Sequence, residues 1–318
     1  RRHVDAAMER WLSGQSGETL KAWTEVILTG FAHEEQHQEL FLSDIKHVLS
    51  RNSFPETGFE AGRRTSARAA RAAVPAPGWV EFEGGMHRFG HGGEGFAFDH
   101  EGPAHQAVLT PFALADRPVT NAEYLAFMND GGYERPEFWL SDGWAVINHA
   151  RRCAPFYWRF GEEGWSEFTL HGLEPLDPDA PVCHLDFYEA DAFAAWAGFR
   201  LPDEREWELA ARAYDPQRAS WADADGRLHP VDPHDDAPLA GLFGQVWEWT
   251  RSSYSPYPGY RAPEGAIGED NGKFMCGQFV LRGGSALTPP GHLRATYRNF
   301  FPPDAQWQMT GLRLARDI

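Results

Sequence analysis

Residues 33–40 place two histidines one helical turn apart, in the order His-Glu-Glu-Gln-His-Gln-Glu-Leu. Residues four apart share one face of an α-helix, so His33 and His37 could bind one metal ion, with Gln36 and Glu39 beside it. Neutral imidazoles are good ligands for first-row transition metals. The alternative is a pair of hydrogen-bonded core histidines, and the spacing alone does not separate the two interpretations.

Glu34 also gives this segment the form His-Glu-x-x-His of zinc proteases, in which the glutamate is the general base beside a zinc-bound water. A carboxylate next to a histidine is equally common on an exposed helix face. The motifs found further along the chain favour a different kind of protein, so a zinc hydrolase is the weaker alternative.

The element that must position these side chains is a long helix. Residues 18–49 contain no proline and one internal glycine, and the spacing predicts an inward face that carries both histidines. Residues 4–12 predict a shorter helix before it. Two helices alone cannot enclose a metal, so we expect partner helices of a bundle upstream of Arg1. The predicted inward face consists of Val26, Gly30, His33, His37, Leu40 and Asp44.

Length and composition indicate a two-domain globular protein: 318 residues, 42% hydrophobic and 24% charged. A formal charge of -17 argues against binding nucleic acid or an anionic membrane. Three cysteines without a close pair argue against a disulfide framework and for a reducing compartment, so we predict a cytoplasmic location. No apolar run approaches a membrane span, and the first residues resemble the middle of a helical domain more than a signal peptide.

The domain boundary is predicted from a change in composition. Residues 1–62 form the helical segment, residues 63–78 a linker rich in Ala, Arg, Ser and Pro, and residues 79–318 a second, loop-rich domain. The fold class is therefore α+β. In the second domain, residues 79–82 and 107–109 predict strands. Capping signals predict helices over 123–129 after Thr120, over 189–197 after Asp186, and over 205–213 after Asp203.

Five motifs of the second domain stand in a recognisable order: RLPDEREWELAAR at 200–212, GQVWEWT at 244–250, VLRGGS at 280–285, YRNFF at 297–301 and GLRLAR at 311–316. Together they resemble the formylglycine-generating-enzyme family over residues 79–318, which implies a C-type-lectin-like fold. The sulfatase-activating members depend on a pair of cysteines near the carboxyl end. Only Cys276 lies in that region here, so the resemblance disfavours formylglycine generation.

The combination of this domain with the upstream His-x-x-Gln-His segment resembles the ergothioneine-biosynthetic sulfoxide synthases, nonheme iron enzymes that join a DinB-like helical bundle to the lectin-like domain. The resemblance implies Fe(II) as cofactor and hercynine (trimethyl-histidine), a thiol and O2 as small-molecule partners. The implied reaction joins the thiol sulfur to C2 of the hercynine imidazole and yields a sulfoxide.

By this resemblance, His33 and His37 match two of three iron ligands, and Gln36 matches a glutamine that hydrogen-bonds the hercynine imidazole. The family's third ligand comes from a segment that does not occur in these 318 residues, so we expect it upstream of Arg1. The catalytic residue, a proton-donating tyrosine, is unknown. Candidates lie in the loop after the Trp-Glu-Trp motif, although packing roles are more common there: Tyr254, Tyr257 and Tyr260.

The motif at 297–301 matches the family's substrate-facing stretch. Asn299 would contact the carboxylate of hercynine, and Phe300 could face its trimethylammonium group through a cation-π contact of about 0.5–2 kcal/mol. Phe301 stands where enzymes that use γ-glutamylcysteine carry an aspartate. A smaller thiol donor such as cysteine is therefore favoured.

A close alternative is a selenoneine synthase, which joins hercynine to a selenosugar. Asp270, Gly277 and Ala286 depart from the usual family pattern, and with Arg298 they are candidates for the donor pocket. An acid and small side chains would suit a polyhydroxylated sugar, which needs acceptors and space. Neutral drift in a loop explains the same departures.

A third alternative, of another class, is a non-catalytic lectin-like binding module with a purely structural helix. A fold does not fix a function, so the loop-rich domain permits this interpretation. It predicts that the protein binds no iron.

Overall fold

The computed structural model describes residues 2–52, 58–59, 76–93, 95–218, 226, 228–232, 237–269, 271–289 and 291–318. Most of the predicted linker at 63–78 lies outside these residues. The helices are α1 (Arg2–Ser13), α2 (Gly17–Ser50), α3 (Asn121–Asn129), α4 (Ser141–Ala150), α5 (Phe187–Trp196) and α6 (Glu204–Ala211). The strands are β1 (Trp79–Phe82), β2 (Gly85–Phe89), β3 (His105–Leu109), β4 (Phe112–Ala115), β5 (Trp158–Gly161), β6 (Gly164–Thr169), β7 (Gly172–Pro175), β8 (Trp247–Ser253), β9 (Phe279–Arg282), β10 (Asn299–Phe301), β11 (Thr310–Gly311) and β12 (Ala315–Asp317).

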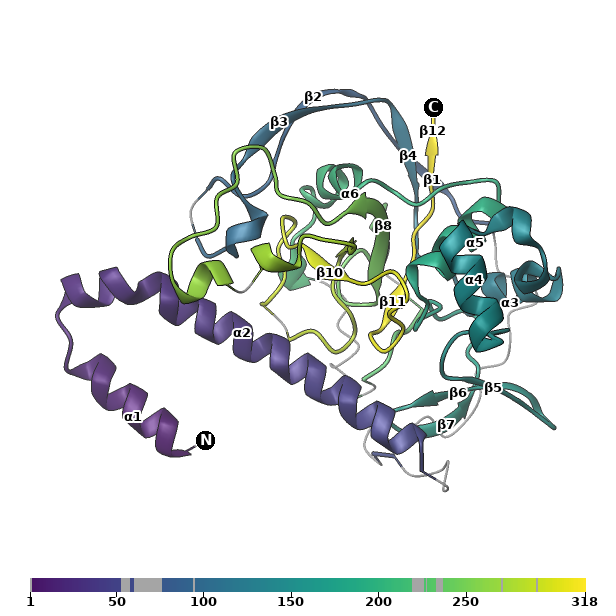
Figure 1. Cartoon of the computed structure of the whole chain (residues 1–318), viewed down its shortest axis with the longest axis horizontal. Helices are drawn as coiled ribbons and strands as arrows, with labels where there is room; N and C mark the ends of the chain where they lie inside the picture. The colour runs from purple at the N-terminus through teal and green to yellow at the C-terminus, as the bar shows by residue number, and fades with distance from the viewer. Residues whose placement is uncertain are drawn as a thin grey trace.

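The two amino-terminal helices confirm the sequence prediction. Ser16 caps α2, because its hydroxyl accepts a hydrogen bond from the backbone N–H of Thr19 at 3.2 Å. Helix α2 runs along the outside of the rest of the chain, whereas α1 turns back from its start and stands apart (Figure 1). None of the residues of α1, all of which the structure describes, is buried.

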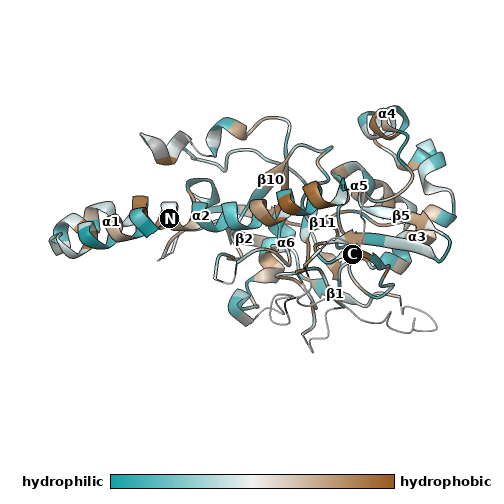
Figure 2. Cartoon of the chain, turned by 90° about the horizontal axis from the view of Figure 1, so that it is seen from below, coloured by the Kyte–Doolittle hydropathy of each residue, from teal (hydrophilic) through white to brown (hydrophobic). Residues whose placement is uncertain are grey.

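The face of α2 that packs against the domain differs from the predicted one. Its buried residues are mostly polar: Ala32, Glu39, Ser43, Lys46 and Ser50. His33 lies one residue from Ala32, which is about 100° around the helix, so the predicted histidine face borders the interface and does not form it. The prediction took apolar residues as inward, but most of the fully buried positions are polar side chains. Leu42 and Ile45, which are partly buried, pack beside them against a small apolar cluster around Cys183. In Figure 2, hydrophobic and hydrophilic turns alternate along the outward side of α2.

The second domain is built from short antiparallel strands and long loops around one central sheet. That sheet has the order β10-β9-β8-β11, with Asn299 opposite Leu281 and Glu248 opposite Arg282. Smaller sheets, β1-β4-β12, β2-β3 and β5-β6-β7, surround it. Figure 1 shows α2 running along one side of the second domain, the side toward which β10 and β11 lie. This arrangement brings α2, which carries His33 and His37, next to the YRNFF motif at 297–301.

The predicted strands at 79–82 and 107–109 are present as β1 and part of β3, and the three capping signals are confirmed. Thr120, Asp186 and Asp203 each cap a helix, and the glutamate three residues later bonds back to the cap's backbone N–H. Helix α4 is an element that the capping analysis misses. Its N-cap is Leu140, whose side chain makes no capping hydrogen bond.

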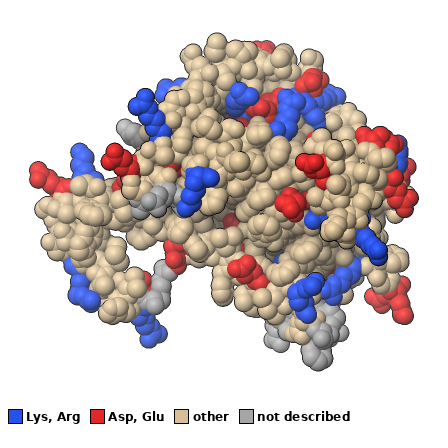
Figure 3. Space-filling model, viewed as in Figure 1, with Lys and Arg blue, Asp and Glu red and all other residues tan. Residues whose placement is uncertain are grey.

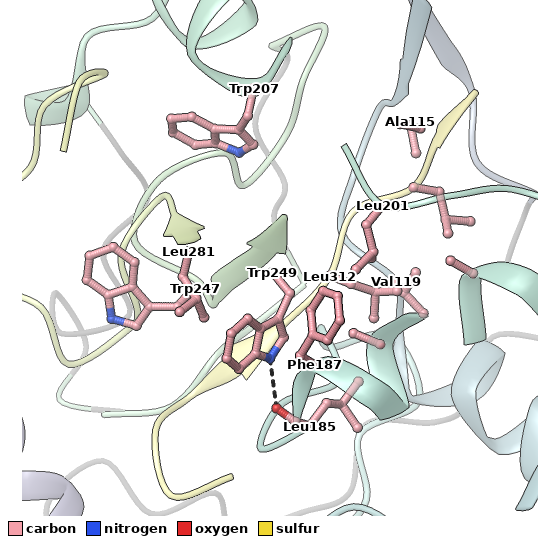
Figure 4. Packing of buried hydrophobic residues seen from close by; sticks show 14 of the residues in the cluster. Ala115, Val119, Leu185, Phe187, Leu201, Trp207, Trp247, Trp249, Leu281 and Leu312 are labelled. Carbon is pink, nitrogen blue, oxygen red and sulfur yellow. Dashed lines mark hydrogen bonds between the residues drawn. The ribbon is translucent and has the colours of Figure 1, made fainter. Parts of the chain in front are cut away.

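Tryptophan and phenylalanine fill the core of the second domain. Trp207, Trp247 and Trp249 are buried around the central sheet, and the indole N–H of Trp249 donates to the backbone oxygen of Leu185 at 3.0 Å (Figure 4). Because these indoles have polar partners, large rings can be buried without leaving donors unsatisfied. The loops that carry the site rest on this rigid core.

Acidic and basic side chains are interspersed over the face seen in Figure 3. Within the described residues, no helix combines the length and the apolar character that crossing a membrane would require.

Candidate functional site

A cavity of about 200 Å³ lies between α2 and the central sheet. Helix α2 forms one wall, β10 and the residues before it form the opposite wall, and the loop around residues 271–274 lies over one side. The lining mixes aromatic rings with amide, hydroxyl and charged groups: His33, Gln36, Glu39, Leu40, His100, Trp247, Asn271, Phe274, Tyr297, Arg298, Asn299, Phe300, Phe301 and Gln308. Most small-molecule sites have such an apolar wall with a few polar groups.

His33 and His37 lie at the edge of this cavity. Their ring centroids are 4.5 Å apart, with the ring planes inclined at 72°. His33 lines the cavity, and both side chains are exposed. Across the part of the chain that the structure describes, no third imidazole, thiol or carboxylate atom joins this pair within 4.8 Å. The two histidines can therefore supply part of a metal site.

A chain of hydrogen bonds positions Gln36. Its amide donates to the Tyr297 hydroxyl at 2.8 Å, and that hydroxyl lies 3.2 Å from Nε2 of His292. Nδ1 of His292 lies 2.8 Å from the carboxylate of Glu35, back on α2. Burial raises the pKa of Tyr297 well above its usual range, so its hydroxyl stays protonated. Tyr297 thus holds the Gln36 amide, and Tyr297 is itself connected through His292 to Glu35 of α2.

Glu39 anchors α2 beside the cavity. Its carboxylate accepts hydrogen bonds from the indole N–H of Trp247 at 2.8 Å, from the Ser285 hydroxyl at 2.6 Å and from the Thr288 hydroxyl at 2.8 Å. Burial raises the pKa of Glu39, and these three donors partly offset that effect. A buried acid with three matched donors fixes the position of the helix along its axis.

The aromatic wall of the cavity is built by β10. The Asn299 side-chain oxygen accepts from the backbone N–H of Phe300 at 2.9 Å, which leaves its amide N–H groups as donors. The Phe300 ring stacks on Tyr254 at 4.0 Å, so one face of the ring is covered. Phe301 lies 5.5 Å from the ring of Trp307. All three residues of β10 line the cavity.

Arg298 lines the cavity, but its charge is already paired. It donates to Glu204 through Nε at 2.9 Å and Nη2 at 3.0 Å, and to the backbone oxygen of His100 at 3.0 Å. Burial and the nearby arginines lower the pKa of His100 well below its usual range, so this imidazole is neutral. Its Nδ1 lies 2.7 Å from the Tyr254 hydroxyl.

The other predicted donor-pocket residues are placed as follows. Asp270 lies outside the described residues. Gly277 has φ of 66°, a conformation that glycine and asparagine tolerate better than other residues. Ala286 is buried in a small apolar cluster. Neither Gly277 nor Ala286 is among the described residues that line the cavity.

Tyr254 and Tyr257 are buried in packing and hydrogen-bonding roles. The Tyr260 hydroxyl donates to Asp99 at 2.6 Å, and the Asn271 amide donates to the same carboxylate at 2.7 Å. The loop above the cavity is therefore tied to η1 (Asp99–Glu101).

Several lining residues lie beyond what sequence reasoning identified: His100, Trp247, Tyr297 and Gln308. Tyr297 and Trp247 belong to two of the quoted motifs. These motifs indicate the fold of the domain, but they do not predict that the two side chains line the cavity. His100 and Gln308 carry no local pattern, because only the long loops between strands bring them to the cavity.

The comparison with known families agrees with this architecture. Residues 65–318 match the family described as "Sulfatase-modifying factor enzyme 1-like domain" (FGE-sulfatase). The chain belongs to this family. The C-type-lectin-like domain expected from the motifs is consistent with that match, and the finding does not extend to the helical segment.

The curated relatives of this chain include proteins named hercynine oxygenase. The relative from Mycolicibacterium smegmatis is 34% identical over 90% of this chain and 70% of its own length. The relative from Mycolicibacterium thermoresistibile is 37% identical over 71% of this chain, and the chain spans 55% of that protein. Among solved structures, PvdO from Pseudomonas aeruginosa has a TM-score of 0.52 at 20% identity, over 84% of this chain and 100% of PvdO, which supports the fold alone.

Proposed function

We propose that this FGE-sulfatase chain belongs to an Fe(II)- and O2-dependent enzyme that joins a sulfur donor to imidazole C2 of hercynine and yields a sulfoxide. One observation carries the proposal: His33 and Gln36 of α2 line the same aromatic-walled cavity as Asn299 and Phe300 of β10. The likeness to hercynine oxygenases, at 34% identity over 90% of the chain, supports the same substrate.

The described residues provide part of the ligand set that an iron ion needs. His33 and His37 would hold it through their imidazoles, which suit Fe(II) and leave positions open for other ligands. When bound, Fe(II) would supply the oxygen chemistry next to the substrate. A third histidine upstream of Arg1 stays a prediction of the sequence, because the described residues add no third donor to this pair.

The cavity offers one polar or aromatic partner for each part of hercynine. Because the Gln36 amide N–H donates to Tyr297, its carbonyl oxygen is the acceptor for an imidazole N–H. Because the Asn299 oxygen is bonded to the Phe300 N–H, its amide N–H groups are donors for a carboxylate. One face of the Phe300 ring is covered by Tyr254. We propose that the ring contacts the trimethylammonium group from the cavity side, where the Phe274 ring lies 5.8 Å away. The imidazole would thus lie nearest to α2.

For the sulfur donor we propose cysteine over γ-glutamylcysteine. Phe301 gives the cavity wall an apolar ring where an aspartate would have bound the larger donor. Among the described residues that line the cavity, Arg298 carries a positive charge, and it is paired with Glu204 inside the protein. A selenosugar is the alternative donor, and it is tested in the same assay.

The test is anaerobic loading of the complete natural protein with Fe(II), then exposure to air with hercynine and one donor at a time: cysteine, γ-glutamylcysteine or a selenosugar. Mass spectrometry identifies the product. We expect a hercynyl-cysteine sulfoxide. A selenium adduct formed only from the selenosugar would replace the sulfur proposal with the selenoneine one.

Two outcomes would overturn the proposal as a whole. Absence of product with every donor, together with no retained iron, would favour the lectin-like binding module. Tight retention of zinc with hydrolytic activity would favour the His-Glu-x-x-His interpretation.

A further inference from the structure

A second group of metal-ligand side chains lies at the other end of α2. Glu167 of β6, Cys183 before α5 and His229 of the segment 228–232 come from three separate segments of the chain. Their ligand atoms all lie within 4.8 Å of one another. Cys183 donates to Glu167 Oε1 at 3.2 Å, and His229 Nε2 lies 3.2 Å from Glu167 Oε2.

We propose that Glu167, Cys183 and His229 form a structural site for a zinc-class divalent ion, separate from the histidine pair on α2. Zinc binds thiolate at about 2.3 Å and imidazole or carboxylate at about 2.0–2.2 Å, so tetrahedral ligand atoms lie roughly 3.3–3.7 Å apart. The two observed contacts of 3.2 Å need to lengthen only by a few tenths of an ångström.

The surroundings suit a closed structural site. Cys183 is 0% exposed and Glu167 is 4% exposed. Cys183 belongs to an apolar cluster against which Leu228, the neighbour of His229, also packs. An apolar shell around mixed sulfur, nitrogen and oxygen ligands limits access of water and strengthens binding. A fourth position could be filled by water or by the second oxygen of Glu167.

The local charges also permit the ion. The buried ammonium group of Lys46 acts electrostatically on the Cys183 thiol and on the Glu167 carboxylate. Zinc would replace the proton that Cys183 shares with it, and the two anionic ligands would then balance the charge of the ion. Lys46 remains bonded to His184, whose Nε2 lies 2.7 Å from its Nζ.

The site is distinct from the catalytic region. From His33 to Lys46, the residue of α2 beside this cluster, the helix rises by about 20 Å. In Figure 1 the carboxyl end of α2 lies beside β6 and β7, and Arg159 of β5 bonds the backbone oxygen of Ser50 at 2.7 Å. An ion here would fasten the 228–232 segment to β6 next to that junction.

The test uses Co(II) as a probe on the metal-free complete protein, because a thiolate ligand gives Co(II) a near-ultraviolet charge-transfer band that histidine and carboxylate do not give. We expect the band to saturate at one equivalent of Co(II) bound through Cys183, and the band must persist in His37→Ala. Cys183→Ser keeps a hydroxyl for Glu167 but offers no thiolate, so it should lose the band.

A variant that replaces the two exposed cysteines, Cys153→Ala with Cys276→Ala, is the matched control and should keep the band. If Cys183→Ser fails to fold, His229→Gln keeps the thiol and should weaken Co(II) binding about tenfold or more. Zinc should raise the melting temperature of the wild type and leave that of Cys183→Ser unchanged. No thiolate band in the wild type, or a band that survives in Cys183→Ser, would overturn the proposal.

Discussion

The side-chain amide of Gln36 donates a hydrogen bond to the hydroxyl of Tyr297, 261 residues further along the chain, at 2.8 Å. A residue of the helix that carries the histidines is therefore held by a residue of the motif at 297–301. The two motifs that sequence reasoning treated separately meet in one hydrogen bond. The geometry of the proposed imidazole contact depends on it.

Replacing Tyr297 by phenylalanine tests this dependence. The change keeps the ring, which packs 5.5 Å from Trp247, and removes only the hydroxyl that holds Gln36 and His292. One neutral hydrogen bond contributes about 1 kcal/mol, so the KM for hercynine should rise about fivefold while the iron content stays unchanged. Steady-state kinetics with iron analysis measures both. An unchanged KM would mean that Gln36 does not need this partner.

The metal assignment is tested by comparing two neighbours on α2. His37→Ala removes a proposed ligand, and we expect iron retention and turnover to be lost. Gln36→Ala removes only the proposed imidazole contact, and we expect iron retention with weaker hercynine binding. Iron stoichiometry after desalting and isothermal titration with hercynine separate the two effects. Full activity in His37→Ala would overturn the metal assignment.

The sequence predicted the extent of α2 closely but not the side of it that packs. An apolar stripe normally indicates the buried face, yet Glu39 and Lys46 lie in the interface here. Their burial depends on partners such as Trp247, Ser285 and His184, which sequence spacing cannot reveal. The helices with capping boxes were predictable because each signal acts within four residues. The cavity was not, because His100 and Gln308 reach it through long loops.

The choice of sulfur donor is tested at Phe301. Phe301→Asp introduces the carboxylate that the resemblance to the sulfoxide synthases associates with γ-glutamylcysteine at this position. We expect kcat/KM for γ-glutamylcysteine to rise about tenfold relative to cysteine, since one charge-assisted hydrogen bond contributes roughly 1.5–3 kcal/mol. Phe301→Leu is the control, because it shortens the side chain without adding a charge. An equal change for both donors in Phe301→Asp would show that this residue does not select the donor.

The pH dependence of stability is predicted from Glu204, which supports the cavity wall from behind. Its carboxylate accepts from Arg298 at 2.9 and 3.0 Å and from Arg282 at 3.0 Å. Burial alone would raise its pKa, but the two arginines hold the pKa of Glu204 below its usual range. The lowered pKa means that the ionised form stabilises the fold above the unfolded value of about 4.3, and this contribution is lost as the pH falls through the folded value.

Glu204→Gln removes the charge and keeps the shape. At pH 7 we expect a loss of about 3 kcal/mol in the free energy of unfolding, because two buried guanidinium groups lose a counter-charge. Below pH 4.3, about the unfolded value, the wild type should lose stability more steeply than the variant, so the difference between them narrows. Urea unfolding at several pH values measures this difference, with the exposed Glu163→Gln as the control. A difference that stays constant from pH 7 to about pH 3 would show that the charge of Glu204 is not what stabilises the pair of arginines behind β10.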